Sequence, residues 1–181
     1  FDPAHILKAE ELAENIRRRF ADEEGGYFRT AIDAEKLLIR PKEIFDGAMP
    51  SGNSAAAVLF DRLFRLTGKE PWRDAAEEQR GFVSRSAGQY PAGCCYALTA
   101  MLTSGASREL VCVTPDETMP ETLKAVLSRY APELTVLVKT PGNAAALAAA
   151  APYTADMQPK DGKPAYYVCT GGSCALPVDM G

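Results

Sequence analysis

The sequence lacks the features that mark several common classes of protein. Its 181 residues contain one histidine, His5, and no run of lysines or arginines longer than the three residues Arg17–Arg19. The longest uncharged stretch, residues 86–107, is broken by proline, glycine and polar residues, so it predicts a buried helix rather than a membrane span. The formal net charge of −4 is spread over interspersed acidic and basic residues. We therefore expect neither a nucleic-acid partner nor a membrane partner.

Motifs for metals and cofactors are also missing. Cys94, Cys95, Cys112 and His5 show no spacing typical of zinc ligands. The first predicted strand is followed by residues 114–116, Thr-Pro-Asp, instead of the glycine-rich loop that binds phosphates. The sequence therefore predicts no metal site and no cofactor.

The sequence begins with Phe-Asp-Pro, without an initiator methionine or a signal peptide. We therefore expect a cytoplasmic protein of which this chain is a piece. A hydrophobic content of 46% in 181 residues is enough to bury a sizeable core. The length fits one large or two small domains.

Helical periodicity dominates the first hundred residues. The segment 9–20 predicts an outer helix because its apolar residues share one face. Residues 54–67 are apolar over most of the circumference, which predicts a buried inner helix. Pro71 opens a third helix with one apolar face, and 92–103 carries no charge, which predicts a second buried helix. The apolar faces comprise Ala9, Leu12, Ala13, Ile16 and Phe20 in the first helix, and Trp72, Ala75, Ala76, Gln79, Phe82 and Val83 in the third.

The pattern changes near residue 105. Residues 109–113, 134–138 and 165–169 are short apolar segments typical of strands, with a helical pattern between the first two. This order predicts a βαβ unit within a small parallel sheet. We therefore predict a mainly α protein in which residues 1–104 form helical hairpins and residues 105–181 form a small α/β subdomain.

A long loop between the first two helices carries the most concentrated polar chemistry. Residues 25–50 are too many for a simple turn, so we interpret the segment as a lid or as the mouth of a site. Its end, 46–54, places an aspartate, two glycines and three polar residues at the start of the inner helix. Ser51 or Asn53 can accept hydrogen bonds from the first free amides of that helix, where the dipole favours an anion or a polarised oxygen.

Two interpretations of this helix start remain open. In the first, Ser51 and Asn53 only cap the helix. In the second, the same residues face a ligand, which we favour because Gly47 and Gly52 would let a substrate approach the backbone closely.

Two motifs resemble those of a known family. The run 35–54, together with Tyr-Val-Cys at 167–169 and Cys-Ala-Leu-Pro-Val at 174–178, resembles the C-terminal part of the thioredoxin-fused toroid proteins. These are the spermatogenesis-associated thioredoxin-domain proteins and their bacterial relatives. The resemblance covers nearly the whole chain. It implies a parent with an N-terminal thioredoxin-like domain and an (α/α)6 toroid similar to N-acylglucosamine 2-epimerases and six-hairpin glycosidases, of which this chain would hold the terminal hairpins.

The resemblance also implies where a ligand lies. Toroids of this kind hold sugars in a central funnel near the ends of the inner helices, which matches the position of Ser51, Asn53 and Ser54. We expect these three residues, with Arg40 and Tyr27, to bind a carbohydrate.

Proton transfer would fall to carboxylates. Epimerases of that fold use histidine, but His5 lies at the start of an outer helix and is expected to be a surface or capping residue. Asp46 or Glu35 would then be the general acid or base, since enclosure in a funnel would raise the pKa of either. For Arg40 and Glu35 we favour a simpler alternative, an ion pair that fixes the loop.

Cys169 and Cys174 form a candidate thiol pair. They are five residues apart across two glycines, which is not the spacing of a thioredoxin-like motif, although the glycines could bring the sulfurs together. For a cytosolic chain we favour buried free thiols that act as small hydrophobes.

Two classes of function follow. The first is a carbohydrate-handling isomerase, epimerase or hydrolase. The second is a non-catalytic binding or scaffold module that serves a thioredoxin-like domain of the parent chain. Exposed faces of the inner helices would in either case favour a homo-oligomer.

Overall fold

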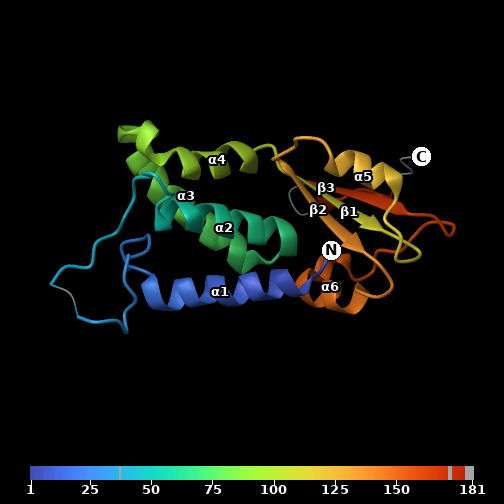
Figure 1. The fold of residues 1–181 in the computed structure, drawn as a ribbon, viewed down its shortest axis with the longest axis horizontal. Helices are drawn as coiled ribbons and strands as arrows, with labels where there is room; N and C mark the ends of the chain where they lie inside the picture. The colour runs from blue at the N-terminus through green and yellow to red at the C-terminus, as the bar shows by residue number, and fades with distance from the viewer. Residues whose placement is uncertain (37, 171–172, 178–181) are drawn as a thin grey trace. The chain divides into compact units, whose positions relative to one another are not determined.

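The computed structural model describes residues 1–36, 38–170 and 173–177. Figure 1 shows its helices and strands. The chain divides into two compact units. One comprises residues 8–64 and 69–105, and the other comprises residues 1–7, 65–68 and the described part of 106–181. No helix among the described residues is long and apolar enough to span a membrane. A mainly α protein with an α/β part is confirmed, whereas a toroid and the predicted domains 1–104 and 105–181 stay predictions.

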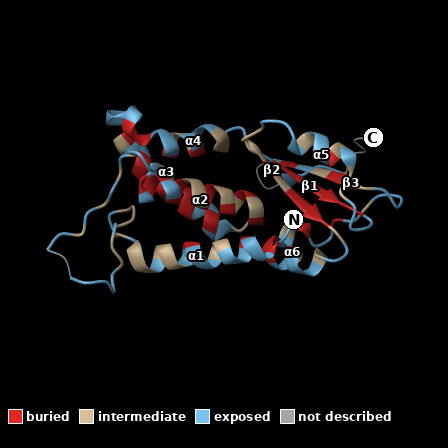
Figure 2. Cartoon of the chain, viewed as in Figure 1, coloured by how far each residue is buried: buried red, intermediate tan, exposed pale blue. Residues whose placement is uncertain are grey.

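The helical unit is built around one central helix. Its elements are α1 (Ala4–Phe20), α2 (Gly52–Thr67), α3 (Glu70–Gln89), the 3-10 helix η1 (Pro91–Cys94) and α4 (Cys95–Ser104); the first turn of α1 and the last turn of α2 belong to the other unit. Figure 2 shows buried residues along most of α2. The predicted burial of this helix is therefore confirmed.

Two apolar clusters hold these helices together. In the first, Phe60 of α2 stacks on Trp72 of α3 with ring centroids 6.0 Å apart, and Ala13 of α1 packs against them. In the second, Val83 of α3 packs with Ala97 of α4. All six residues of the predicted apolar face of α3 are buried, because their spacing places them on one side of the helix.

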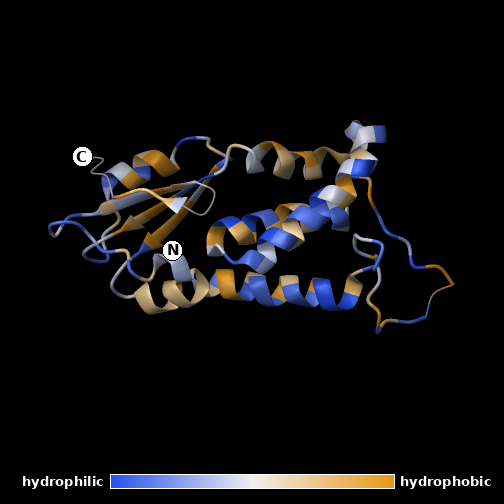
Figure 3. Ribbon diagram, turned by 180° about the vertical axis from the view of Figure 1, so that it is seen from behind, coloured by the Kyte–Doolittle hydropathy of each residue, from blue (hydrophilic) through white to orange (hydrophobic). Residues whose placement is uncertain are grey.

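Two predictions of burial, one for Leu12 and one for α4, are wrong. Leu12 lies on the predicted apolar face of α1 but is 52% exposed. The uncharged α4, predicted to be buried, buries only Ala97 and Ala100, while Leu102 is 79% exposed. Figure 3 shows that α4 is nevertheless largely hydrophobic. The lack of charge in α4 therefore predicted its burial wrongly. A helix is buried only where other elements cover its faces.

The second unit contains a four-stranded sheet in the order β2-β1-β3-β4. Its elements are β1 (Arg108–Val113), α5 (Glu121–Leu127), β2 (Leu134–Lys139), α6 (Ala144–Ala150), the 3-10 helix η2 (Pro152–Thr154), β3 (Ala165–Thr170) and β4 (Ser173–Cys174). The parallel pairing of β1 with β2 confirms the predicted βαβ unit.

The prediction of a parallel sheet is wrong for the third strand. β3 runs antiparallel to β1. Ala165, its first residue, pairs with Val113, the last residue of β1. The chain after η2 therefore enters the sheet at the carboxyl end of β1. No helix crosses back between η2 and β3 to return the chain to the other edge, as a parallel strand would require.

A buried lysine fixes the chain beyond the parallel strands. Lys139, at the end of β2, is 6% exposed. Its ammonium group donates hydrogen bonds to the carbonyl groups of Thr154, Ala155 and Met157 at 2.7–2.8 Å. Burial lowers the pKa of Lys139, and the charge of Asp156 opposes that effect. These three bonds anchor residues 154–157 to the edge of the sheet.

Candidate functional site

Asn53 anchors the long loop to the start of α2. Its Oδ1 accepts the amide hydrogen of Tyr27 at 2.8 Å, and its Nδ2 donates to the carbonyl groups of Tyr27 at 2.9 Å and Glu43 at 2.7 Å. Gln79 of α3 donates to the Asn53 carbonyl group at 2.9 Å. Asn53 is 1% exposed. One buried side chain thus joins both ends of the loop to two helices.

Ser51, one of the two capping candidates in the sequence, is the N-cap of α2. Its Oγ accepts the amide hydrogen of Ser54 at 3.1 Å and donates to the carbonyl group of Ile44 at 3.0 Å. Ser51 and Ser54 are 1% and 0% exposed, and their hydroxyl oxygens lie 3.0 Å apart. Both side chains bond to the protein itself, and their predicted contact with a ligand stays a prediction.

Asp46 bridges two helix starts. One carboxylate oxygen accepts the amide hydrogen of Ser51 at 2.9 Å, and the other accepts the amide hydrogen of Tyr96, in the first turn of α4, at 2.8 Å. Partial burial raises the pKa of Asp46, but the hydrogen bonds outweigh burial and lower it. A lowered pKa favours the carboxylate that caps a helix rather than a general acid.

A cleft of about 230 Å³ lies beside this anchored loop. Phe20, Tyr27 and Phe28 provide aromatic walls. Burial raises the pKa of Tyr27 to about 12, so its hydroxyl group stays protonated at neutral pH. Arg29 and Glu43, both exposed, contribute charged side chains to the lining of the cleft. The lining is completed by Ile16, Gly52 and Asn53.

The glycines predicted to admit a ligand border open space. A Cβ atom added at Gly47 or Gly52 would meet no described atom within 4 Å. Gly26, by contrast, has a φ of 77° and lies against the ring of Phe82, so that packing requires a glycine there. The start of the loop is therefore tightly packed, and its end is open.

Arg40 and Glu35 are not brought together as an ion pair. Arg40 donates to the carbonyl group of Thr30 at 2.7 Å, and its guanidinium group lies 4.1 Å from the ring centroid of Phe28. Glu35 is exposed and does not line the cleft. Arg40 instead braces an aromatic wall of the cleft, which the charge pattern alone did not indicate.

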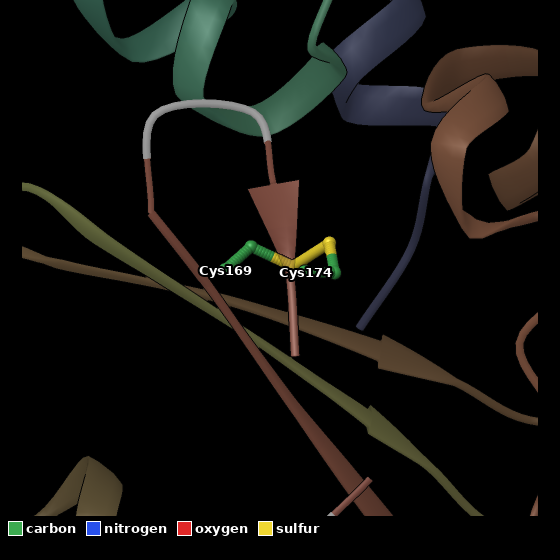
Figure 4. The surroundings of a disulfide bond; sticks show 2 residues. All are labelled: Cys169 and Cys174. Atoms are coloured by element: carbon green, nitrogen blue, oxygen red, sulfur yellow. A yellow bond between two sulfur atoms is a disulfide. The ribbon is translucent and has the colours of Figure 1, made fainter. Parts of the chain in front are cut away.

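Cys169 and Cys174 form a disulfide between β3 and β4, as Figure 4 shows. The preference for free thiols is therefore wrong for this pair. It holds for Cys94 and Cys112, which are free and buried. Burial raises the pKa of Cys112 to about 11, and that thiol is accordingly unreactive at neutral pH.

Among the described residues, no group of three His, Cys, Asp or Glu side chains could hold a metal ion.

A second cavity, of about 450 Å³, lies at the carboxyl ends of β1 and β2. Thr114, Lys139 and Thr140 supply polar atoms, but the prolines and alanines of the adjoining loops and α6 make much of the wall apolar. Lys139 uses its donors on the three carbonyl groups described above. The βαβ pattern could have indicated this cavity, because clefts often lie beyond the carboxyl ends of parallel strands.

Sequence reasoning also missed Phe20, Arg29, Glu43 and Gln79. Phe20 and Gln79 were assigned to apolar helix faces, and both are consistent with that role, since Gln79 is 2% exposed. Their contribution to the site depends on how the loop folds back on α1 and α3. Helical periodicity carries no information about that path.

Comparison with known proteins finds distant relatives. No protein-family profile matches the chain. The chain is 23% identical to Spermatogenesis-associated protein 20 of Homo sapiens over 158 residues, which is 85% of this chain and 20% of the relative. The same figures hold for Spermatogenesis-associated protein 20 of Rattus norvegicus. The chain is thus distantly similar to these proteins over most of its length and spans about a fifth of theirs.

Proposed function

We propose that the chain is a binding module whose aromatic cleft holds a carbohydrate. The observation that carries this proposal is the arrangement of Phe20, Tyr27 and Phe28 around a small cleft with Arg29 and Glu43 at its polar side. Apolar walls with a few placed polar groups are typical of small-molecule sites. A volume of about 230 Å³ favours a small ligand such as a single sugar unit.

The same geometry favours binding over hydrolysis. A glycosidase usually needs two carboxylates that face each other across the substrate. Among the residues described as lining the cleft, Glu43 supplies a carboxylate, while Asp46 is bonded to two backbone amides. Catalysis by Asp46 or Glu35 would require residues from the remainder of a larger toroid, which the distant similarity to a much longer protein makes reasonable.

The proposal is tested by titrating the chain with monosaccharides and disaccharides by isothermal calorimetry. Glu43→Gln and Arg29→Gln each remove a charged group while leaving the backbone bonds of the loop intact. Loss of one hydrogen bond to a charged group should weaken binding about tenfold. Glu23→Gln, an exposed change outside the cleft, is the matched control and should bind like the original chain. Equal binding by all variants, or no binding of any saccharide, would refute the proposal.

A second function is favoured by the disulfide. We propose that Cys169 and Cys174 exchange with a dithiol partner, for which a thioredoxin-like domain of the parent chain is the candidate. Cys174 is exposed, so one sulfur of the bond is open to an attacking thiolate. Incubation with a reduced dithiol protein, followed by mass analysis of the trapped thiols, tests this function. A disulfide that stays intact under these conditions would contradict it.

The apolar face of α4 supports the proposed assembly. Tyr96 and Leu102 are 40% and 79% exposed on a helix that carries no charge. We propose that further toroid hairpins cover this face in the parent and that a second copy covers it in the isolated chain. Light scattering should then give a mass above that of one chain at high concentration, and Leu102→Lys should shift it towards the monomer.

A further inference from the structure

The disulfide lies beside a buried acidic residue on the same face of the sheet. Glu109 of β1 and Cys169 of β3 are directly paired in antiparallel register. Side chains of such a pair project from the same face, with Cβ atoms roughly 4.5–5.5 Å apart. Cys169 is 2% exposed and Glu109 is 7% exposed. A carboxylate that is almost inaccessible to water therefore neighbours the buried sulfur.

A cation accompanies that carboxylate. Arg65, in the last turn of α2, is 4% exposed, and its Nε lies 3.7 Å from Oε1 of Glu109. Its guanidinium group also donates to the carbonyl group of Glu133. Charges that are removed from water interact more strongly than charges at the surface. The Arg65–Glu109 pair can therefore influence a charge that develops on Cys169.

Uncharged side chains also pack around Cys169. Ile6 of α1 and Leu147 of α6 contribute apolar side chains to the same cluster. Tyr153 of η2 packs against the cluster, and burial together with the charge of Glu109 raises the pKa of its hydroxyl group. Glu109, by strand register, and Arg65, by its ion pair with Glu109, are the charged groups among the described residues on which the proposal rests.

We propose that the buried Arg65–Glu109 pair controls the exchange of the Cys169–Cys174 disulfide by setting the stability of the Cys169 thiolate. The proposal rests on the thiol exchange proposed above and states which sulfur is attacked and which sulfur leaves. The thiolate of an external dithiol attacks Sγ of Cys174, which is exposed, and forms a mixed disulfide. The Cys169–Cys174 bond breaks, and its electron pair leaves on Sγ of Cys169.

The second thiol of the external dithiol completes the reaction. It loses its proton, attacks the mixed disulfide and releases Cys174 as a thiolate. The external dithiol is oxidised to a disulfide, this chain is reduced, and the two protons of the dithiol end on Cys169 and Cys174. Only the first step places negative charge in the buried site. Arg65 stabilises that charge, and Glu109 opposes it.

Two substitutions should therefore act in opposite directions. Glu109→Gln removes the negative charge that lies 3.7 Å from Nε of Arg65, so the balance of charge beside Cys169 becomes more positive and the pKa of the leaving thiol falls. Arg65→Gln removes the nearby positive charge and raises the pKa of the leaving thiol of Cys169. A change of about one pKa unit in a thiol alters the exchange rate about threefold. We expect reduction of the disulfide to be about threefold faster in Glu109→Gln and about threefold slower in Arg65→Gln.

The experiment follows reduction of the oxidised chain by dithiothreitol at pH 7, with acid quench, alkylation and mass analysis of the peptide that carries both cysteines. Asp156→Asn, an exposed charge change in the same unit, is the control and should match the original chain. Thermal unfolding of each variant is measured in parallel.

Opposed shifts support the proposal because general loosening of the fold would accelerate reduction in both variants. Rates that are unchanged, or that shift in the same direction, would overturn it even if the disulfide is exchangeable. If Arg65→Gln does not fold, a faster rate in folded Glu109→Gln supports the proposal and an unchanged rate overturns it. A disulfide that resists dithiothreitol in the original chain refutes the proposed exchange itself.

Discussion

Replacing Asn53 by alanine should destabilise the fold far more than removing a surface amide. The substitution leaves three backbone groups without their partner, namely the amide and carbonyl groups of Tyr27 and the carbonyl group of Glu43. If each unsatisfied group costs about 1 kcal/mol, the free energy of unfolding falls by about 3 kcal/mol. Gln79 also loses its contact with Oδ1 of Asn53, which lies 3.1 Å away.

Urea unfolding followed by circular dichroism measures this loss. Asn15→Ala is the matched control, because Asn15 bonds to the Glu11 carbonyl group on the exposed side of α1. That variant should stay within about 0.5 kcal/mol of the original chain. If Asn53→Ala lowers the free energy of unfolding by less than about 1 kcal/mol but abolishes saccharide binding, Asn53 does not hold the loop in place. That result would favour direct contact between Asn53 and a ligand.

Three further substitutions test the packing and electrostatics. Because hydrogen bonds lower the pKa of Asp46 in the folded chain, its carboxylate stabilises the fold above the unfolded pKa of about 3.9. Asp46→Asn should cost about 1–2 kcal/mol at pH 7, and this difference should shrink as the pH falls through the folded pKa, as urea unfolding at several pH values would show. Phe60→Ala should cost about 3–5 kcal/mol by calorimetry, because Phe60 is 0% exposed. Lys139→Met should cost about 3 kcal/mol in the same assay if each of its three carbonyl partners loses about 1 kcal/mol, and a neutral effect would contradict the anchoring role.

Local sequence patterns predicted the helices and the parallel strand pair well. The apolar face of α3 followed directly from residue spacing, and the burial of α2 followed from its apolar circumference. These features depend on residues within one element. Residue periodicity within a segment carries most of that information, although Leu12 and α4 are more exposed than it predicts.

Features that depend on long-range contacts were not predictable in the same way. The direction of β3 depends on where residues 155–164 lead the chain, and the disulfide depends on the register of β3 with β4. Asp46 was identified as a polar residue of the mouth, but its bond to Tyr96 joins positions that are fifty residues apart. Its capping role at α4 could therefore not be read from the neighbouring sequence.

The most direct test of the proposed function is to map a bound saccharide on the chain by NMR. Amide resonances of the isotopically labelled chain are followed while the saccharide with the strongest calorimetric signal is added. The account predicts shifts concentrated at Tyr27, Arg29 and Asn53, with Glu43→Gln reducing them. Shifts centred on Thr114 and Lys139 at the second cavity, or no shifts at all, would contradict it.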